Sequence, residues 1–575
     1  MSTDRLAAAE VLEQIAGFLE FRGENQFRVR TFRAAAKVVM GLPGSVAEAL
    51  ADGSLAATRG VGPATLAIIT EVLASGRSSY LEELKLQVPA GLLDMMGVPG
   101  LGPTRVRQLH ERLGIASLDA LETAARDGAL ARLPGFGEKT AEKLLKGIAF
   151  VRGTQAFRLW PQAAAEAEVL RVALQRIPGV ARAVTAGEVR RRCEVVGELA
   201  FAVLTEAPGD AVRRALAELP GIGEVTAAEP GLLTFRPAGG MTARVRLASA
   251  ADFGVALVRA TGSESHLVQL AAHAERAGYL LGPHSFSGAG AVIPAPEEAT
   301  LYRTLGLSEI PAELREGGEE VTRAAQGSLP LLLEAADLAG LLHCHTTYSD
   351  GTLSVADLAG AARDAGYAYL GITDHSKSAA YAGGLSVDRV RRQWAEIDAL
   401  NAGAGLRILK GIECDILVDG QLDYDDATLA GFDFVIGSIH SRFSLSEAEM
   451  TARVLRALDH PRLTILGHPT GRLLLSRTAY PLDLDQVFAR AAATGVALEI
   501  NGDPHRLDLD WRLVRRARER GVLISIGADA HNREGLAYAE FGLAMARKAG
   551  LEKAEVLNTR PVEEFLAFAQ ARRTR

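Results

Sequence analysis

Histidines and carboxylates gather in the C-terminal part of the chain, at the ends of short apolar runs. Eight of the twelve histidines fall between His343 and His531, about twice the number that an even distribution would place there. His343 and His345 are separated by one residue, so on a strand both side chains point to one face and can bind one ion. Imidazoles mixed with carboxylates suit zinc, manganese or iron better than magnesium or calcium. The candidate metal-ligating and catalytic residues are His343, His345, Asp350, His375, Glu413, His440, His468, Asp529 and His531.

Seven apolar runs, separated by helix-length segments, must position these groups. They read LAGLLHCHTTYSDG, YAYLGITDH, LRILKGIECD, DFVIGSIHS, LTILGHP, VALEINGDP and VLISIGADAH. The alternation predicts a parallel sheet, and the number of runs suggests a closed barrel whose chemistry lies at the carboxyl ends of the strands. Clustered divalent cations lower the pKa of a bound water to about 7 and offset charge on a phosphoryl oxygen, which indicates phosphoester hydrolysis. Arg472 and Arg506 either bind a phosphate or form structural ion pairs.

A Gly–apolar–Gly turn before a helical pattern occurs three times in the N-terminal part. The pairs are Gly60 with Gly62, Gly100 with Gly102, and Gly135 with Gly137. Such a turn presents backbone N–H groups and the positive end of a helix, so it can hold phosphate whatever the base sequence. One copy is more often a glycine-capped helix pair, whereas three copies favour phosphate binding.

One helical face upstream of these turns is basic. Arg30, Arg33 and Lys37 recur at positions i, i+3 and i+7, so a helix would place them on one side. This face either reaches DNA phosphates or is simply solvated.

Composition sets limits on the class of protein. The 575 residues, 48% hydrophobic and 23% charged, are typical of a globular protein with several domains. Cys193, Cys344 and Cys414 form no CxxC pair, so neither a disulfide framework nor a zinc finger is indicated. The net charge of −7 argues against a uniformly basic nucleic-acid binder but permits local basic faces. Without a membrane-spanning run or a signal peptide, we expect a cytoplasmic, nucleoid-associated monomer with no membrane partner.

The motifs HCHTTYSDG, TDHS, GIECDI, SIHS, GHPTGRLL and ADAH resemble those of the polymerase-and-histidinol-phosphatase (PHP) family. The resemblance implies a distorted seven-stranded barrel with three divalent metal ions (Mn, Zn or Fe). It implies one ion held by His343, His345, Glu413 and Asp529, a second by Glu413, His440 and His468, and a third by Asp350, His375 and His531.

Glycine turns followed by a PHP domain resemble the bacterial family X DNA polymerases over nearly the whole chain. The supporting stretches include FRGENQFRVRTFRAAAK, GEVRRRCEVVGE and FGVALVRATGSESH. In that family three palm aspartates hold two magnesium ions, and the matching positions here are Glu198, Ala200 and Arg244. One carboxylate beside an arginine has a net charge near zero and cannot retain two dications. We therefore expect a degenerate polymerase site without magnesium.

Other family contacts with the nucleotide and the DNA are also altered. The Gly-Ser that precedes the triphosphate-binding arginines is Gly187–Glu188, and the arginines match Arg190 to Arg192. The aromatic pair before Thr-Gly-Ser is Arg259–Ala260, and Ile68 stands where some members carry a lyase lysine.

The expected fold is multidomain: an α-helical helix-hairpin-helix N-terminal region, an α+β nucleotidyltransferase-like palm and thumb, and a C-terminal α/β distorted (βα)7 barrel. The expected domains are a helical DNA-binding domain (1–80), a fingers-like helix-hairpin-helix domain (81–152), a degenerate palm (153–262), a thumb-like region (263–318), a linker (319–336) and the PHP barrel (337–575).

The resemblance implies a DNA-repair enzyme whose PHP domain removes nucleotides from 3′ ends of gapped or nicked DNA. Three alternatives remain open: an active gap-filling polymerase with a PHP exonuclease, a non-enzymatic DNA-end scaffold, and a small-molecule phosphatase.

Overall fold

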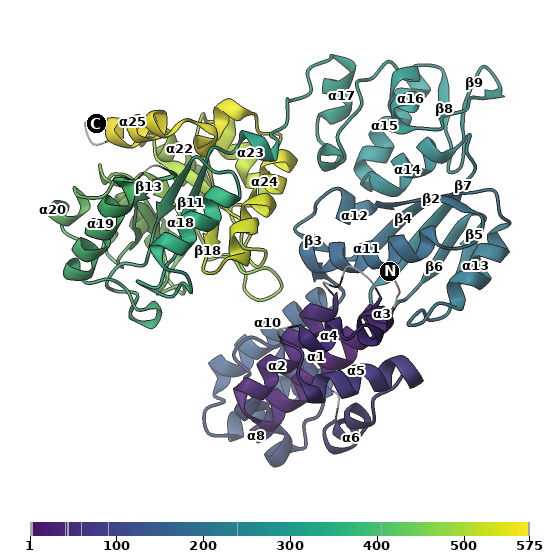
Figure 1. The fold of residues 1–575 in the computed structure, drawn as a ribbon, viewed down its shortest axis with the longest axis horizontal. Coiled ribbons are helices and arrows are strands. Elements are labelled where there is room, and N and C mark those ends of the chain that lie inside the picture. Colours follow the sequence, from purple (N-terminus) through teal and green to yellow (C-terminus); the bar gives the residue numbers. More distant parts are fainter. Residues whose placement is uncertain are drawn as a thin grey trace. The chain divides into compact units, whose positions relative to one another are not determined.

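The computed structural model describes residues 4–40, 42, 45–58, 60–89, 91–238, 240–403 and 405–572. The chain divides into two compact units, Met1–Gly327 (unit 1) and Ser328–Arg575 (unit 2), shown in Figure 1.

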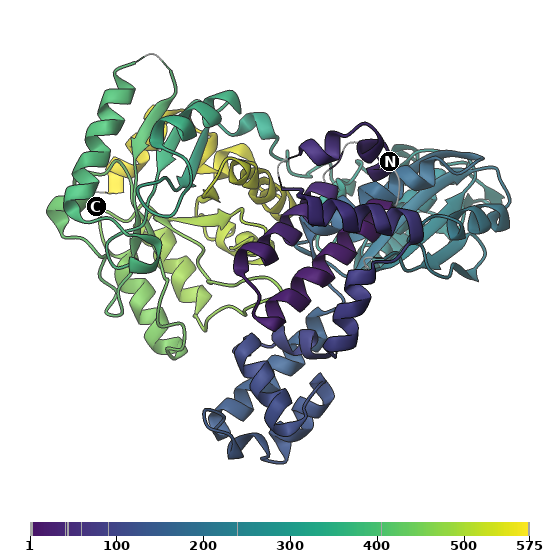
Figure 2. The same cartoon turned by 60° about the horizontal axis from the view of Figure 1, so that its bottom comes forward.

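Unit 1 begins with helices that share one apolar core. Helices α1 (Asp4–Arg22) and α2 (Gln26–Met40) pack side by side, in the darkest purple of Figure 2. Leu12, Ile15 and Leu19 of α1 recur at helical spacing and are fully buried. The helices that follow are α3 (Val46–Ala51), α4 (Ser54–Ala57), α5 (Pro63–Ser75), α6 (Ser79–Gln87), α7 (Gly91–Met96), α8 (Pro103–Leu113), α9 (Leu118–Arg126) and α10 (Glu138–Thr154).

A five-stranded sheet of order β2-β4-β7-β6-β5 lies in the region that the sequence predicted as the palm. Its central pair, β4 and β7, is parallel, whereas the outer pairs are antiparallel. Along β4, Leu199 and Phe201 join the core beside α11, while Ala200 and Ala202 face α14, so both faces of the strand are buried. The strands are β2 (Val180–Ala186), β4 (Glu198–Thr205), β5 (Thr226–Glu229), β6 (Leu232–Phe235) and β7 (Thr242–Ala248), beside the short pair β1 (Arg158–Leu159) and β3 (Val195–Val196).

Helices and a small antiparallel sheet complete unit 1. The helices are α11 (Trp160–Gln175), α12 (Gly187–Arg190), α13 (Gly209–Ala217), α14 (Phe253–Thr261), α15 (Glu264–Arg276), α16 (Glu298–Thr304) and α17 (Glu320–Ala325). The sheet consists of β8 (Tyr279–Leu281), β9 (Phe286–Gly288) and β10 (Ala291–Val292).

The stretch 319–336, expected as a linker, is not irregular throughout. It contains α17, whose Val321 and Ala324 are buried, and the Glu320 carboxylate lies 2.8 Å from His266 Nδ1 of α15. These contacts place α17 within unit 1, and the unit boundary follows at Gly327.

The described part of unit 2 contains eight parallel strands in the order β13-β12-β11-β18-β17-β16-β15-β14. The predicted run LRILKGIECD is interrupted: β13 pairs with β12, and β14, two residues later, pairs with β15. This segment therefore joins the two ends of the sheet and closes it into a barrel of seven strand positions. The strands are β11 (Gly340–Cys344), β12 (Tyr369–Ile372), β13 (Arg407–Lys410), β14 (Glu413–Asp415), β15 (Ile436–Ser438), β16 (Ile465–Leu466), β17 (Ala497–Asn501) and β18 (Ile524–Ala530).

Close packing requires a glycine between β13 and β14. A side chain at Gly411 would meet the Phe434 ring at 2.6 Å and the Ile372 carbonyl oxygen at 2.7 Å, so only glycine fits there. The parallel barrel and the helical N-terminal region predicted from the sequence are thus both present.

Helices surround the barrel strands, as Figure 1 shows. On β11, Leu341 packs with Leu358 and Ala361 of α18, while Leu342 belongs to a second cluster with Phe434 and Ile436, as strand alternation requires. The helices are α18 (Val355–Asp364), α19 (Val387–Asn401), α20 (Asp426–Leu429), α21 (Glu447–Leu458), α22 (Leu484–Thr494), α23 (Trp511–Arg518), α24 (Tyr538–Ala549) and α25 (Val562–Arg572).

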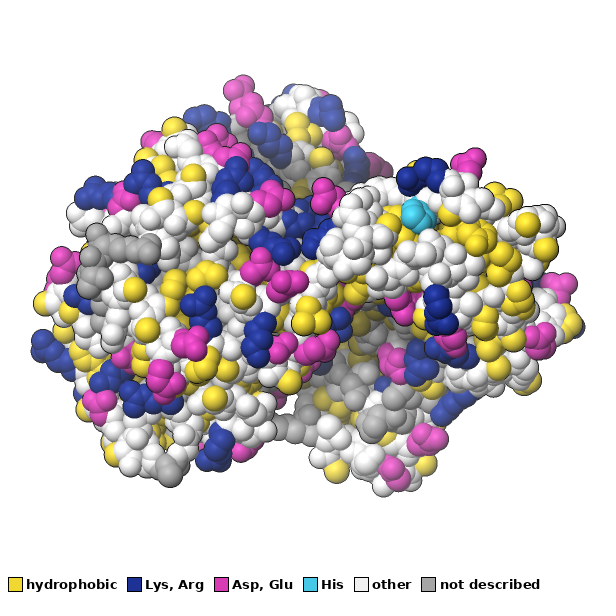
Figure 3. Space-filling model, turned by 90° about the horizontal axis from the view of Figure 1, so that it is seen from above, with side chains coloured by type: hydrophobic (Ala, Val, Ile, Leu, Met, Phe, Trp, Pro, Cys, Tyr) yellow, Lys and Arg dark blue, Asp and Glu magenta, His cyan; other side chains and the backbone are white. Residues whose placement is uncertain are grey.

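Two further features concern the helices and the surface. Among the helices that the structure describes, none combines the length and the apolar character needed to cross a membrane. Lys and Arg side chains alternate with Asp and Glu over the face in Figure 3, so that face carries no extended field of one sign.

Candidate metal centre

Eight of the nine candidate residues lie at the carboxyl ends of barrel strands or in the loops that follow them. Four stand within a strand or directly after it: His343 and His345 at β11, and Asp529 and His531 at β18. Glu413 begins β14, and the other four lie in the loops that follow β11, β12, β15 and β16: Asp350, His375, His440 and His468.

Glu413 lies at the middle of the cluster and is 1% exposed. One carboxylate oxygen is 2.9 Å from His468 Nε2 and 3.2 Å from His440 Nε2, and the other oxygen is 2.9 Å from His375 Nδ1. Because both oxygens of this one carboxylate face imidazoles, Glu413 would be a central ligand for any divalent cation that the cluster holds.

Asp529 gathers the two histidines of β11. Its Oδ1 lies 3.1 Å from His345 Nε2 and 3.5 Å from His343 Nε2, and these three residues form one group with metal-ligand spacing. A second group unites His375, Glu413 and His440.

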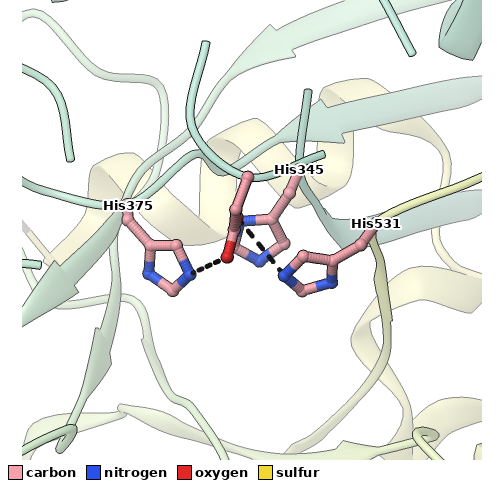
Figure 4. Close-up of side chains that lie close together, drawn as sticks. His345, His375 and His531 are labelled. Atoms are coloured by element: carbon pink, nitrogen blue, oxygen red, sulfur yellow. Dashed lines mark ion pairs between the residues drawn. The ribbon is translucent and has the colours of Figure 1, made fainter. Parts of the chain in front are cut away.

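A third group surrounds Asp350. In Figure 4 the rings of His345, His375 and His531 are turned towards one carboxylate between them. Asp350 is 3.4 Å from His531 Nε2, 3.6 Å from His375 Nε2 and 3.7 Å from His345 Nδ1. The family pattern assigned His375 to this ion alone and His345 to another, whereas the structure places each of them in two groups.

The backbone is strained at three of these residues. His343, His468 and Asp529 have φ angles of 63°, 25° and 51°, in a region that non-glycine residues seldom occupy. Such conformations cost about 1–3 kcal/mol each and concentrate at functional sites.

Charge coupling dominates at His343 and Glu413, whereas burial dominates at His345 and His468 and lowers the pKa of both. Burial by itself lowers the pKa of His343, but the carboxylates of Glu499 and Asp529 raise it well above its usual range. Burial by itself raises the pKa of Glu413, but the neighbouring imidazoles, His440 foremost, hold it well below its usual range. Positive charge inside this ring of carboxylates is therefore strongly favoured.

The donor set fits divalent cations. Several buried polar atoms of the cluster lie close to one another but make no hydrogen bond of normal geometry within the described residues, although buried polar atoms are normally paired. They are His343 Nε2, both ring nitrogens of His345, His375 Nδ1, Glu413 Oε2 and His468 Nδ1. Unpaired imidazole nitrogens that converge with carboxylates are the ligands that Mn, Zn and Fe prefer.

Two further carboxylates, Glu499 and Asp415, orient two of the histidines. Neither was among the residues predicted from the sequence. His343 Nδ1 donates to Glu499 at 2.6 Å, and His440 Nδ1 donates to Asp415 at 2.5 Å. Each bond fixes a tautomer that leaves Nε2 free to face the cluster. Two sequence features could have indicated these residues: Glu499 is a charged residue inside the apolar run VALEIN, and Asp415 is a second acid two residues after Glu413.

Asp374 holds the loop that carries Asp350. Its carboxylate accepts hydrogen bonds from Thr346 N at 2.8 Å, from Thr346 Oγ1 at 2.6 Å and from Gln393 Nε2 at 2.6 Å. The acid in the motif TDHS is therefore a positioning group beside the candidate ligand His375.

The two arginines considered for phosphate binding differ in their surroundings. Arg472 pairs with Asp510 at 2.7 Å and donates to the carbonyl of Arg506, which is a structural arrangement. The Arg506 guanidinium lies 3.7 Å from Asp529 and so borders the cluster.

The palm residues that match the family's metal ligands lie together but form an ion pair. Arg244 on β7 is in register with Ala200 on β4, and its Nε is 3.0 Å from the Glu198 carboxylate. Burial raises the pKa of Glu198 more than Arg244 lowers it. No further carboxylate shares a metal-ligand cluster with them among the described residues.

The three arginines that match the triphosphate motif are also paired. Arg190 binds Glu298 through both guanidinium ends, at 2.8 and 2.6 Å. Arg191 lies 2.9 Å from Glu316, and Arg192 lies 3.6 Å from Glu313. Their charges are thus neutralised by carboxylates of the thumb-like region.

The three glycine turns share one geometry. Gly60, Gly100 and Gly135 have φ angles of 101°, 89° and 86°, which favour glycine. The second glycines, Gly62, Gly102 and Gly137, are the N-caps of α5, α8 and α10. An added side chain would meet no atom within 4 Å at Gly100, Gly102, Gly135 or Gly137, so these turns are open to an approaching phosphate.

The basic face of α2 is only partly available. Arg30 and Lys37 are exposed, whereas Arg33 is 2.6 Å from Glu20 of α1. This exposed pair weakens Arg33 as a phosphate contact.

Four domain models match the chain. They are a helix-hairpin-helix domain (residues 4–78), a SAM-like helix-hairpin-helix tandem (92–149), the DNA polymerase beta thumb (256–316) and the PHP domain (342–501).

Curated relatives match either nearly the whole chain or a smaller part of it. The DNA polymerase/3′-5′ exonuclease PolX of Bacillus subtilis is 36% identical over 97% of this chain and 98% of its own length. Probable phosphatases of Syntrophotalea carbinolica and Vibrio parahaemolyticus are each 32% identical over 28% of this chain, covering 69% and 66% of their own lengths.

Proposed function

Because this chain belongs to the bacterial family X DNA polymerases that carry a C-terminal PHP domain, we propose that it is a DNA-repair enzyme that hydrolyses DNA at 3′ ends. The observation that carries the proposal is the contrast between its two sites. The barrel brings eight of the nine candidate ligands into three groups with metal-ligand spacing, and the ninth, His468, lies 2.9 Å from Glu413, whereas the palm retains a single carboxylate paired with Arg244.

The barrel residues supply the hydrolytic site. Divalent cations held by the nine ligands would lower the pKa of a water molecule and offset negative charge on a phosphoryl oxygen. Glu499 and Asp415 keep the rings of His343 and His440 in the orientation that such ligands require. Arg506, beside Asp529, is placed to contact a non-bridging phosphate oxygen.

An exposed aromatic ring suits a nucleic-acid substrate. Tyr381 is 71% exposed, and its ring centroid lies 6.1 Å from that of His375 and 6.3 Å from that of His440. An aromatic face at the edge of a phosphoester site can stack on the terminal base without sequence preference.

The glycine turns would hold the DNA backbone. Their exposed amides and helix N-termini suit phosphate contacts that are blind to sequence. Gapped, nicked or 3′-ended DNA is the substrate class that this combination favours, and the protein would act as a monomer.

Nucleotidyl transfer is not part of the proposed function. Two magnesium ions need several anionic oxygens, and the palm site offers Glu198 beside a cation. The paired state of Arg190, Arg191 and Arg192 removes the usual contacts for a triphosphate as well.

A second candidate reaction is the removal of a 3′-phosphate by the same barrel. The similarity of the barrel to probable phosphatases favours it. In both reactions water attacks phosphorus and the 3′-oxygen of the remaining strand leaves; they differ in whether the departing phosphate also carries a terminal nucleoside through its 5′-oxygen.

One gapped duplex, labelled at the 5′ end of its upstream strand, tests the proposal. With Mn²⁺ and deoxynucleotides, we expect the labelled strand to shorten one nucleotide at a time and never to lengthen. Strand extension, or stable binding without shortening under any divalent metal, would contradict the proposal.

A further inference from the structure

Arg453 of α21 is a buried cation beside the metal centre. It is 2% exposed and forms no ion pair with any residue that the structure describes. Burial lowers its pKa, although Tyr480, Asp415 and Asp419 oppose that shift from longer range. A buried charge without a paired counterion is costly, and an apolar side chain of similar volume is often no less stable. The position of this charge therefore indicates a role beyond packing.

The Arg453 guanidinium joins two segments of the chain. Its Nε donates to the Leu417 carbonyl at 2.8 Å and to the Ile416 carbonyl at 3.2 Å, and Nη2 also donates to the Ile416 carbonyl. Its Nη1 donates to the Ser441 carbonyl at 3.0 Å. The first two carbonyls lie directly after β14, and the third lies in the loop that follows β15. These hydrogen bonds, the Arg453 clamp, hold the two segments against each other.

Each segment begins next to one partner of a hydrogen bond in the metal centre. Ile416 follows Asp415, and Ser441 follows His440. His440 Nδ1 donates to Asp415 at 2.5 Å, and His440 Nε2 lies 3.2 Å from Glu413. The clamp thus spans the backbone immediately after both partners, so it sets how closely the Asp415 carboxylate and the His440 ring approach.

The backbone on both sides of the clamp has an uncommon conformation. Arg442, directly after Ser441, has a φ angle of 60°, which non-glycine residues seldom adopt. On the other segment, Gly420 has a φ angle of 83°, and an added side chain there would meet the Arg453 carbonyl oxygen at 2.7 Å. The turn at Gly420 therefore packs directly against α21, and the loop after β15 is held in a strained conformation.

We propose that Arg453 is a positioning residue of the metal centre, because its clamp keeps the Asp415 carboxylate against the His440 ring. This inference rests on the proposed metal-dependent function of the barrel. The group of His375, Glu413 and His440 depends on the clamp. The group that β11 and β18 carry lies on other strands and does not depend on it.

Arg453→Lys tests the clamp, because an ammonium group keeps the charge but cannot reach carbonyls on both segments at once. Competition with a fluorescent chelator measures the Mn²⁺ affinity of the full-length protein after metal removal. We expect one class of bound ion to weaken about tenfold or more, while the other ions keep the wild-type affinity. Arg453→Met, which fills similar space without a donor, should lose the same class of ion. Arg456→Lys, an exposed arginine on the same helix, is the matched control and should bind Mn²⁺ as the wild type does.

Two further measurements separate positioning from a general loss of stability. Asp415→Asn combined with Arg453→Lys should weaken Mn²⁺ binding no more than the stronger single variant, because both substitutions act on His440. Hydrogen exchange in EDTA should be faster in Arg453→Lys over residues 414–418 and 438–445, and unchanged around His343.

Three results would overturn the inference: wild-type affinity in folded Arg453→Lys, equal weakening of every bound ion, or additive effects with Asp415→Asn. Absence of Mn²⁺ binding by the wild type would instead overturn the proposed function. In that case the exchange rates in EDTA still decide whether Arg453 holds the two segments, so the two failures are distinguishable.

Discussion

The Arg244 guanidinium lies 3.0 Å from the Glu198 carboxylate, on the strand directly beside it. Glu198 is thus paired within the sheet where the family holds metal ions. We predict that Glu198→Ala leaves 3′-end hydrolysis unchanged, and that neither the wild type nor the variant incorporates nucleotides. Single-nucleotide extension assays with Mg²⁺ and Mn²⁺ check this outcome, and incorporation by the wild type that the substitution abolishes would show an active polymerase site.

Glu499 should govern metal affinity although it is not among the predicted ligands. Glu499→Gln keeps the shape of the side chain but removes the charge that holds His343 Nδ1, so we expect metal to bind about 10- to 100-fold more weakly. Competition with a fluorescent chelator measures this affinity directly, without reliance on activity. Glu447→Gln, an exposed glutamate of α21, is the matched control and should bind metal as the wild type does. Unchanged metal affinity in Glu499→Gln would show that Glu499 does not position His343.

Glu298 should stabilise unit 1 through two arginines. Its carboxylate faces Arg190 and the fully buried Arg315, and these contacts outweigh burial and lower its pKa to about 2. Glu298→Gln leaves both cations without a counterion, so we expect a loss of about 3–5 kcal/mol in the free energy of unfolding at pH 7. Glu297, the preceding residue, forms an exposed pair with Arg182. Glu297→Gln should therefore lower the free energy of unfolding by less than about 1 kcal/mol.

The effect of Glu298 should depend on pH with a defined sign. Because the folded-state pKa lies below the usual value of 4.5, the stabilisation of about 3 kcal/mol is complete above pH 4.5 and is lost as the pH falls towards 2. Urea unfolding at several pH values should show that the difference in free energy of unfolding between the wild type and Glu298→Gln, the stability gap, narrows below about pH 4.5. A gap that widens as the pH falls would contradict this assignment.

Tyr381 should distinguish DNA from a simple phosphoester. If its exposed ring stacks on the terminal base, Tyr381→Ala should raise KM for DNA about tenfold, whereas hydrolysis of p-nitrophenyl phosphate should change little. Tyr381→Phe retains the ring and serves as the control. Equal effects of Tyr381→Ala on both substrates would assign the residue to the metal site instead.

Strand-end spacing was sufficient to predict where the nine candidate residues would meet. Parallel strands bring their carboxyl ends to one edge, so His343 and Asp529 become neighbours although they are far apart in sequence. The membership of His345 and His375 in two groups each was not predictable, because it depends on ring orientation rather than on position along the strand.

Residues that act by orienting another side chain could not be predicted from the sequence for the same reason. Glu499 has no recognisable motif, and its role emerges only where Gly527 on the adjacent strand leaves room for its carboxylate: a side chain there would meet the Glu499 oxygen at 1.9 Å. The burial of α17 in the expected linker likewise depends on its contact with His266, 54 residues away.

Nucleotide release from 5′-labelled gapped DNA, compared between the wild type and His343→Ala with His345→Ala, tests the central claim most directly. The wild type with Mn²⁺ should produce a ladder of shortened strands, and the double variant should lose this activity while it still binds the duplex through the N-terminal turns. Full shortening by the double variant, or loss of DNA binding together with hydrolysis, would contradict the assignment of the chemistry to the barrel.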